Sequence, residues 1–235
     1  MRRRREENEA DADNFFVSWG DLVTLLLVFF VYLFSISEID VIKFLEAKDA
    51  LGSKMDNPIQ SEKIEKMKLE QEKLQEMQEK LEEYIETEEL EDVVDIEYLD
   101  DRLELNFGNA LLFTTGSSEL KKKALEVMTE VSNITKEINS IIVVEGHTDN
   151  IPIKTDQFPS NWELSSARAA SVVRSMIAKG VPARRFVVIG YHQYKPLVPN
   201  NSVQNRAKNR RVKITIKPDI ESLLSESRRG DGQNA

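Results

Sequence analysis

Apolar and polar residues divide the chain into one long apolar segment, a charged middle segment and a region of shorter alternating patterns. Residues 15–37 (FFVSWGDLVTLLLVFFVYLFSIS) are mostly apolar and contain one charged residue, Asp21. As a helix rising about 1.5 Å per residue, this segment covers roughly 34 Å, which is enough for a bilayer core of about 30 Å. The pattern therefore predicts a single transmembrane helix at 15–37.

Two segments of different character follow the predicted span. Residues 38–58 mix apolar and charged side chains and form a short amphipathic segment that can lie on a membrane or against a partner. Residues 59–92 are rich in Glu, Lys, Gln and Leu, with apolar residues three or four positions apart, which predicts a charged helical linker. A solvated helix, a partly disordered spacer and a two-stranded coiled coil all remain open. The apolar seam favours pairing slightly, although Glu70 interrupts it.

Residues 93–218 have the alternating strand and helix patterns of an α+β domain, and residues 219–235 are expected to be a flexible tail. Period-two alternation predicts a hairpin of strands at 93–98 and 102–107. Ser117 or Ser118 is expected to cap a helix that continues to Ile134. A buried strand at 141–145, a helix from Asn161 to about Lys179 and strands at 186–191 and 212–217 complete the prediction.

Charge and composition narrow the possible functions. Arg2 to Arg5 precede the span, so the positive-inside rule places residues 1–14 in the cytoplasm as a short tail and the head outside the membrane. A cleaved signal peptide is disfavoured because the apolar stretch is longer than a typical h-region. The chain has no Cys and two His, which excludes disulfides and cysteine metal sites, and we expect no metal and no cofactor. The net charge of −9 argues against nucleic acid as a partner, despite Arg210 and Arg211.

No enzyme signature is visible in the sequence. It lacks a phosphate-binding glycine loop, and no Ser nucleophile stands at a readable spacing from a His base. His147 has only His192 as a possible second imidazole ligand, so a structural hydrogen bond is the preferred interpretation for it. Trp162 is interpreted as a packing residue, with a sugar-stacking platform as the alternative.

Asp21 is the strongest functional signal in the sequence. An ionised Asp near the middle of a membrane helix costs about 2.5 to 3.5 kcal/mol, a penalty avoided by protonation, by a bound cation or by a wet protein cavity. Ser18 and Thr24 are three residues away on either side, on nearly the same helix face, and are candidates to support an ion path. We therefore expect Asp21 to bind H⁺ or Na⁺.

Three ordered motifs carry a resemblance in the head: GHTDNIPI at 146–153, NWELSSARAASVV at 161–173 and NRRVKITI at 209–216. They resemble the OmpA C-terminal-like family of peptidoglycan-binding domains. The span SWGDLVTLLLVFFVYLFS is similar to that of MotB-like flagellar stator subunits, including the sodium-driven MotS and PomB members. The resemblance implies a stator subunit of the cytoplasmic membrane with an OmpA-like βαβαβ-type head at the cell wall, two copies of the chain and a polytopic MotA-like partner.

The resemblance also assigns roles to individual residues. In the family, the Asp matching Asp149 pairs with an ammonium of the peptidoglycan stem peptide, and the Arg matching Arg168 holds a carboxylate through its planar fork. A salt bridge between these two side chains is the structural alternative. The motif positions that resemble further ligand contacts or their supports are Thr148, Asn161, Leu164 and Arg211, and those that match a plug blocking ion leakage are Ile39, Ile42, Phe44 and Leu45.

Two alternatives to a stator remain. One is a passive tether that joins membrane and wall, with Asp21 as a helix-packing contact. The other is a force transducer resembling ExbD or TolR, whose periplasmic domains lack the NWELSSARA and NRRV motifs. For the plug-like segment, a connector lying on the membrane surface is the alternative. The segment LVFF followed by LFSISEID resembles the sodium-driven MotS pattern, which implies a slight preference for Na⁺ over H⁺, and both ions can use a single Asp.

Overall fold

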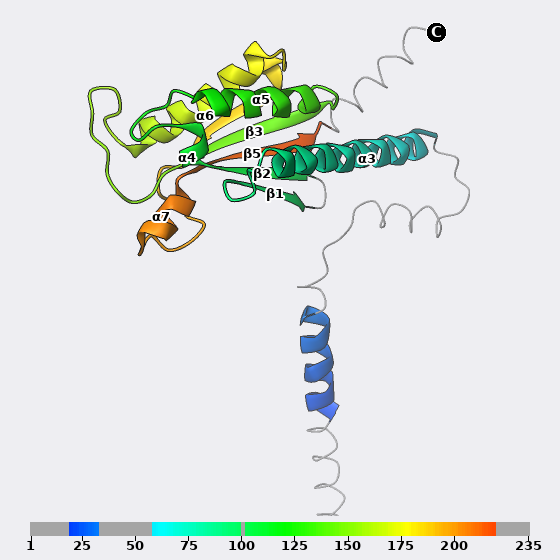
Figure 1. Cartoon of the computed structure of the whole chain (residues 1–235). Helices are drawn as coiled ribbons and strands as arrows, with labels where there is room; N and C mark the ends of the chain where they lie inside the picture. The colour runs from blue at the N-terminus through cyan, green and yellow to red at the C-terminus, as the bar shows by residue number, and fades with distance from the viewer. Residues whose placement is uncertain (1–18, 33–57, 100–101, 220–235) are drawn as a thin grey trace, which may run out of the picture. The chain divides into compact units, whose positions relative to one another are not determined.

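The computed structural model describes residues 19–32, 58–99 and 102–219, and the chain divides into two compact units, Met1–Met55 and Asp56–Ala235. In the first unit, residues 19–32 are helical and are drawn in blue in Figure 1. Within the described ranges, no helix combines the length and apolarity needed to cross a membrane. Several predictions lie outside the described residues: the cytoplasmic tail at 1–14, both ends of the span at 15–37, Ser18, the four plug positions and all but the first residue of the tail at 219–235.

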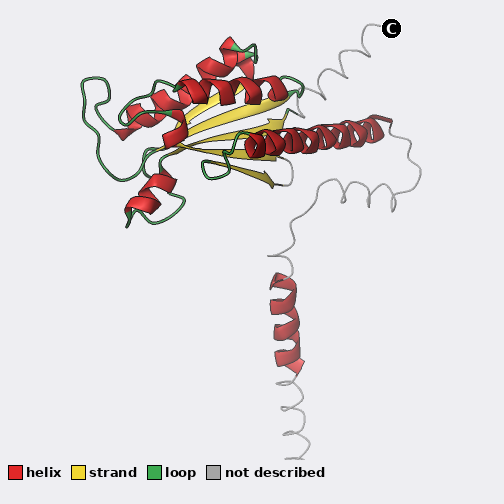
Figure 2. Cartoon of the chain, viewed as in Figure 1, coloured by secondary structure: helices red, strands yellow, loops and turns green. Residues whose placement is uncertain are grey.

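The second unit is built on a five-stranded sheet in the order β1-β2-β5-β3-β4 (Figures 1 and 2). The neighbouring pairs are antiparallel except β3 and β4, which are parallel and joined through α6. The predicted α+β head and its initial hairpin are therefore confirmed. The strands are β1 (Val94–Leu99), β2 (Arg102–Gly108), β3 (Ser140–His147), β4 (Phe186–Gly190) and β5 (Arg211–Pro218).

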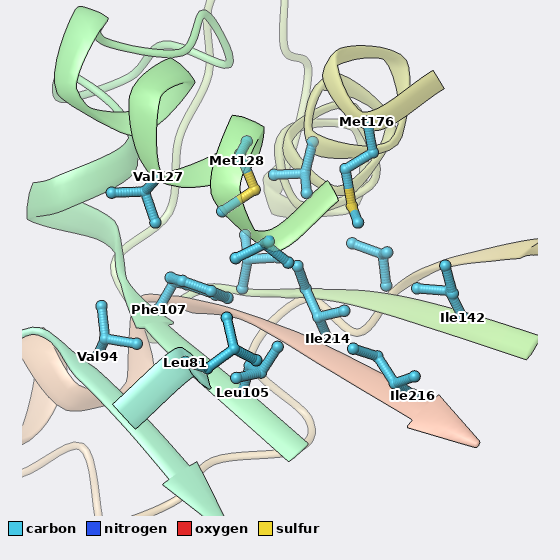
Figure 3. Close-up of a cluster of buried hydrophobic side chains, with 14 of the residues drawn as sticks. Leu81, Val94, Leu105, Phe107, Val127, Met128, Ile142, Met176, Ile214 and Ile216 are labelled. Atoms are coloured by element: carbon cyan, nitrogen blue, oxygen red, sulfur yellow. The ribbon is translucent and has the colours of Figure 1, made fainter. Parts of the chain in front are cut away.

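Helices α5 (Lys122–Thr135) and α6 (Asn161–Ala178) lie side by side over one face of the sheet (Figure 1). Alternate strand residues point to that face and are buried, as the period of two requires. Figure 3 shows Leu105, Ile142 and Ile214 from three strands beneath Met128 of α5 and Met176 of α6. The intervening residues of β2 and β5, such as Glu104 and Lys213, are less buried and point to the opposite face of the sheet, as the alternation along each strand requires. The apolar side chains therefore form one layer between the sheet and the helices.

The predicted linker contributes to this core. Helix α3 (Pro58–Thr87) buries one seam against α5, β1 and β2. Leu74, Met77, Leu81 and Ile85 keep between 0% and 8% of their surface exposed and belong to the same apolar cluster as the sheet. The second half of the seam is covered by the head. It is therefore not a solvated helix, a disordered spacer or a coiled coil with a second copy, the three alternatives left open by the sequence.

We expect Leu81→Ala to destabilise the head by about 2 to 5 kcal/mol, because it leaves a cavity in a fully packed core. Leu69→Ala on the same helix is the matched control, since Leu69 is 50% exposed, and it should change stability by less than about 0.5 kcal/mol. Denaturant unfolding of the full chain, followed by tryptophan fluorescence, measures both values. Equal effects of the two substitutions would show that α3 is not part of the head's core.

Two connections differ from the sequence prediction. Helix α5 begins after Lys121 rather than after Ser117 or Ser118, because the chain first turns at Thr115 and Gly116 and a bridge then pairs Leu120 with Phe113. The Asn- and Pro-rich segment between β4 and β5 contains α7 (Val203–Asn209), whose cap Ser202 accepts a hydrogen bond from the Asn205 amide at 3.0 Å. Short elements α4 (Asn109–Leu112) and η1 (Ala183–Arg185) were also not predicted.

Candidate functional site

The site forms where β3 ends and α6 begins. Ser160 caps α6 in a reciprocal capping box with Glu163, so the helix starts rigidly at Asn161. Two glycines let this helix lie against the sheet. A Cβ at Gly146 would be 2.0 Å from the Ser165 carbonyl oxygen, and one at Gly190 would be 2.1 Å from the Ser166 hydroxyl. The close approach places the first turn of α6 beside the loop that follows β3.

Hydrogen bonds then shape that loop. The Asn161 side chain donates to the Ile151 carbonyl oxygen at 2.8 Å, and the Ile151 amide donates to Asp149 Oδ1 at 3.0 Å. The Thr148 amide donates to the His192 carbonyl oxygen at 2.9 Å, which ties the loop to the segment after β4. The hydrogen bond from the Ile151 backbone amide to Oδ1 therefore fixes the orientation of the Asp149 carboxylate.

All six residues predicted to bind or support the wall ligand line one cavity of about 1210 Å³. Asn161, Leu164 and Arg168 are spaced three and four residues apart and so share one face of α6. The loop contributes Thr148 and Asp149, and Arg211 comes from the start of β5. Tertiary structure thus brings together residues from three separate motifs, although their contact with a ligand stays a prediction.

Asp149 forms an ion pair in this cavity with Arg210. The distance from Arg210 Nη1 to Asp149 Oδ2 is 2.6 Å, and the Asp149 side chain is 7% exposed. The predicted alternative of a salt bridge between Asp149 and Arg168 is wrong, because Arg210 is the partner of Asp149. In the sequence, Arg210 was a candidate only for contact with nucleic acid. Its position beside Arg211 in the NRRV motif was the available signal.

Arg168 is held in place by groups other than Asp149. Its Nε donates to the Ser117 carbonyl oxygen at 2.9 Å, and its guanidinium lies 5.2 Å from the centre of the Phe113 ring. Within the described part of the chain, its two terminal nitrogens have no hydrogen-bond partner. Burial, together with the charge of Arg210, lowers the pKa of Arg168 to about 10, and Asp149 opposes this shift. Arg168 therefore keeps its charge at neutral pH and can bind a carboxylate.

Arg211 and Thr148 leave polar atoms unpaired in the same cavity. Among the described residues, the buried Arg211 Nε and Thr148 Oγ1 have no hydrogen-bond partner. Burial lowers the pKa of Arg211 to about 10, with Glu145 opposing the shift, so this side chain also remains a cation. Buried polar atoms without partners are uncommon in proteins, and a group that binds at the site is one explanation for them. The cavity can accept carboxylates at its guanidinium groups and an ammonium at Asp149.

The structural hydrogen bond expected for His147 is not formed, because both of its ring nitrogens are buried without a hydrogen-bond partner among the described residues. Its ring stacks on Tyr191 with centroids 5.2 Å apart, and its Nε2 is 3.7 Å from Glu145. Burial lowers the pKa of His147, and Glu145 opposes that shift. The ranges that the structure describes contain no group of three or more side chains suited to a metal ion.

The predicted ion site lies in the separate helical segment at 19–32. Asp21 and Thr24 are on this helix, and the Thr24 hydroxyl donates to the Gly20 carbonyl oxygen at 2.7 Å. Since that bond uses the hydroxyl hydrogen, an oxygen lone pair remains available to a cation. The roles of Asp21, Ser18 and Thr24 stay predictions.

Comparison with known proteins shows where the chain belongs. Residues 112–210 match the model of the OmpA family, and residues 1–55 match the model described as membrane MotB of the proton-channel complex MotA/MotB. The protein YtxE of Bacillus subtilis is 34% identical over 92% of this chain and 96% of its own length. Motility protein B of the same species is 29% identical over 92% of this chain and 95% of its own length. The chain belongs to the MotB-like family of OmpA-type peptidoglycan-binding proteins.

Solved structures support the fold of this MotB-like protein. The cell wall anchor of the T6SS from Pseudomonas aeruginosa matches 59% of the chain and 97% of its own length, with 30% identity and a TM-score of 0.56. A MotB-like protein from Desulfovibrio vulgaris matches 64% of the chain and 99% of its own length, with 26% identity and a TM-score of 0.57. Members of the family are structural and stator proteins, so the prediction that the chain is not an enzyme is confirmed.

Proposed function

We propose that this MotB-like protein is a flagellar stator subunit that conducts ions together with a MotA-like channel partner and anchors the complex to peptidoglycan. The observation that carries the proposal is the similarity to motility protein B along 92% of the chain, which includes both the Asp21 segment and the head. A passive tether accounts for the head alone. It gives no reason for a carboxylate within an apolar segment.

In this proposal the head holds the stator fixed to the cell wall, so that the complex can exert force on the rotor. Arg168 and Arg211 bind carboxylates of a peptidoglycan stem peptide, while Asp149 binds the ammonium of a diamino acid such as diaminopimelate. Binding at Asp149 requires the ligand ammonium to replace Arg210, whose side chain is more exposed than that of Asp149 and can turn away. The released Arg210 then adds a further cation beside the ligand carboxylates. The cavity therefore suits a zwitterionic ligand.

The ion-carrying role is assigned to Asp21. The carboxylate binds H⁺ or Na⁺ from outside, loses its charge and releases the ion to the cytoplasm when the partner changes conformation. Each elementary charge moved across 100 mV supplies about 2.3 kcal/mol for such a step. One helix cannot enclose a path, so a polytopic MotA-like partner is required. The resemblance to stator subunits implies that two copies of this chain sit within a ring of that partner. The chain is placed in the cytoplasmic membrane, with its N-terminus inside and its head at the wall.

Residues Ile39 to Leu51 are proposed to plug the ion path before the complex joins the motor. We expect cells that make a variant lacking these residues, together with the partner, to grow poorly as protons or sodium ions enter. Adding Asp21→Asn to the same deletion should restore growth, because the path then lacks its ion-binding carboxylate. Cytoplasmic pH and sodium, measured with intracellular indicators, test this. Unchanged ion levels in the deletion variant would favour a surface-lying connector, and leakage that persists with Asn would contradict the role of Asp21.

A further inference from the structure

Three aromatic rings form a cluster that the proposed stem-peptide site does not use. Trp162 lies in the first turn of α6, and His192 and Tyr194 follow β4. Ring centres are 5.1 Å apart for Trp162 and His192, 5.6 Å for Trp162 and Tyr194, and 5.0 Å for His192 and Tyr194. Trp162 is nevertheless 46% exposed and Tyr194 is 64% exposed. We call these three rings the aromatic platform, because they contact one another and still present a large surface to water.

Hydrogen bonds from the backbone amides of His192 and Tyr194 fix the segment that carries two of the platform's rings. The His192 amide donates to the Ser165 hydroxyl at 3.3 Å, and the Tyr194 amide donates to the Tyr191 carbonyl oxygen at 3.1 Å. His192 has a φ of 55°, in the left-handed region that a residue with a Cβ rarely adopts. A strained conformation persists where its surroundings impose it, and such residues cluster at functional sites. The rings are thus ordered before any ligand arrives, which limits the entropy lost on binding.

The platform is also joined to the wall of the cavity. Trp162 directly follows Asn161, which lines the cavity, and the His192 carbonyl oxygen accepts the hydrogen bond of Thr148, which lines it too. Asn161 and Trp162 occupy neighbouring faces of one helical turn. Because an α-helix with its side chains is about 10 to 12 Å across, the two surfaces lie within roughly one helix diameter of each other.

We propose that the aromatic platform binds a sugar ring of the peptidoglycan glycan strand while the attached stem peptide occupies the cavity. This inference rests on the function proposed above. The stem peptide is linked to its amino sugar through a short lactyl group, so a bound peptide brings a pyranose ring close to the cavity's edge. The C–H groups on one face of a β-linked pyranose are weakly positive and fit the negative face of an aromatic ring. Charged groups are not needed for this contact, which agrees with a platform built only of aromatic rings.

The test compares two soluble ligands for the purified full chain by titration calorimetry. One is a stem tripeptide ending in diaminopimelate, and the other is the same tripeptide on its N-acetylglucosaminyl-N-acetylmuramyl disaccharide. We expect the disaccharide form to bind wild type about 3- to 10-fold more tightly, from the usual strength of one or two ring contacts. The double variant Trp162→Ala with Tyr194→Ala should lose this preference while its affinity for the free tripeptide is unchanged.

Two controls separate ring stacking from general damage to the head. Trp162→Phe keeps an aromatic face and should retain most of the preference. Leu125→Ala on α5 removes an apolar side chain that is 42% exposed and does not line the cavity, and should leave both affinities unchanged. Equal binding of the two ligands to wild type, or a preference that survives in the double variant, would overturn the platform's role. If wild type binds neither ligand, the wall-anchoring function itself is wrong, and the platform proposal is wrong with it.

Discussion

Replacing Asp21 by Asn is expected to stop flagellar rotation completely in cells whose motors depend on this chain and its MotA-like partner. Asn has nearly the same shape as Asp but carries no charge, so it neither takes up a proton at neutral pH nor balances the charge of a sodium ion. Without a bound ion, the membrane potential has no charge to move at this site. Tethered-cell rotation measures the effect directly.

The same measurement addresses the choice of ion. At fixed pH, we expect the wild-type speed to rise with external sodium, following the slight preference for Na⁺ in the sequence around the span. A speed independent of sodium would assign H⁺ instead. Asp21→Glu is the matched control because it keeps the carboxylate, and it should retain measurable rotation. Normal rotation of the Asn variant would contradict the ion-carrying role and make the passive tether the leading account.

Replacing Arg168 by Lys is expected to weaken binding of the full chain to purified peptidoglycan sacculi by about 30-fold or more, the loss typical of breaking a buried, hydrogen-bonded charge pair. Lys keeps the positive charge but lacks the planar fork that binds a carboxylate through two parallel hydrogen bonds. It also loses the Nε bond to Ser117 that orients the side chain in the cavity. Co-sedimentation with sacculi, with and without competing stem tripeptide, measures this affinity.

Arg174→Lys is the matched control for this experiment. Arg174 is on the same helix, does not line the cavity and donates to the Ser171 hydroxyl at 2.6 Å. We expect its affinity for sacculi to match that of wild type. Thermal unfolding of both variants shows whether the head remains folded. If folded Arg168→Lys protein binds sacculi as tightly as wild type, Arg168 does not hold the ligand carboxylate.

Much of the head was predictable because its signals are local. Period-two alternation marked the strands of the hairpin, and the glycine and proline at 180–182 marked the end of α6. The GHTD, NWELSSARA and NRRV motifs identified residues that line one cavity, since each motif fixes the geometry of a short segment. A helix capped by Ser117 or Ser118 and continuing to Ile134 was also expected, but its start was misplaced because the bridge between Phe113 and Leu120 is a contact outside the helix.

Several features of the site depend on residues far apart in sequence. Arg210 pairs with Asp149 across 61 positions, and Arg168 bonds to Ser117 across 51. Neither contact belongs to a periodic sequence pattern. For this reason the sequence suggested Arg168, and not Arg210, as the side chain that could form a salt bridge with Asp149. The aromatic platform likewise joins Trp162 to rings about 30 residues later, through the parallel pairing of β3 with β4.

By itself, the sequence determined the order of segments, the α+β class of the head and the residue types that we propose bind a zwitterionic wall ligand. These properties follow from apolar runs, periodicity and short motifs, all of which involve residues close together in the sequence. Only the tertiary structure decided that α3 completes the core, that Arg210 forms an ion pair with Asp149 and that three aromatic rings contact one another beside the cavity. The sequence shows that an apolar seam must be buried and that a buried charge must be paired. The packing of the whole head decides which residues lie close enough to do so.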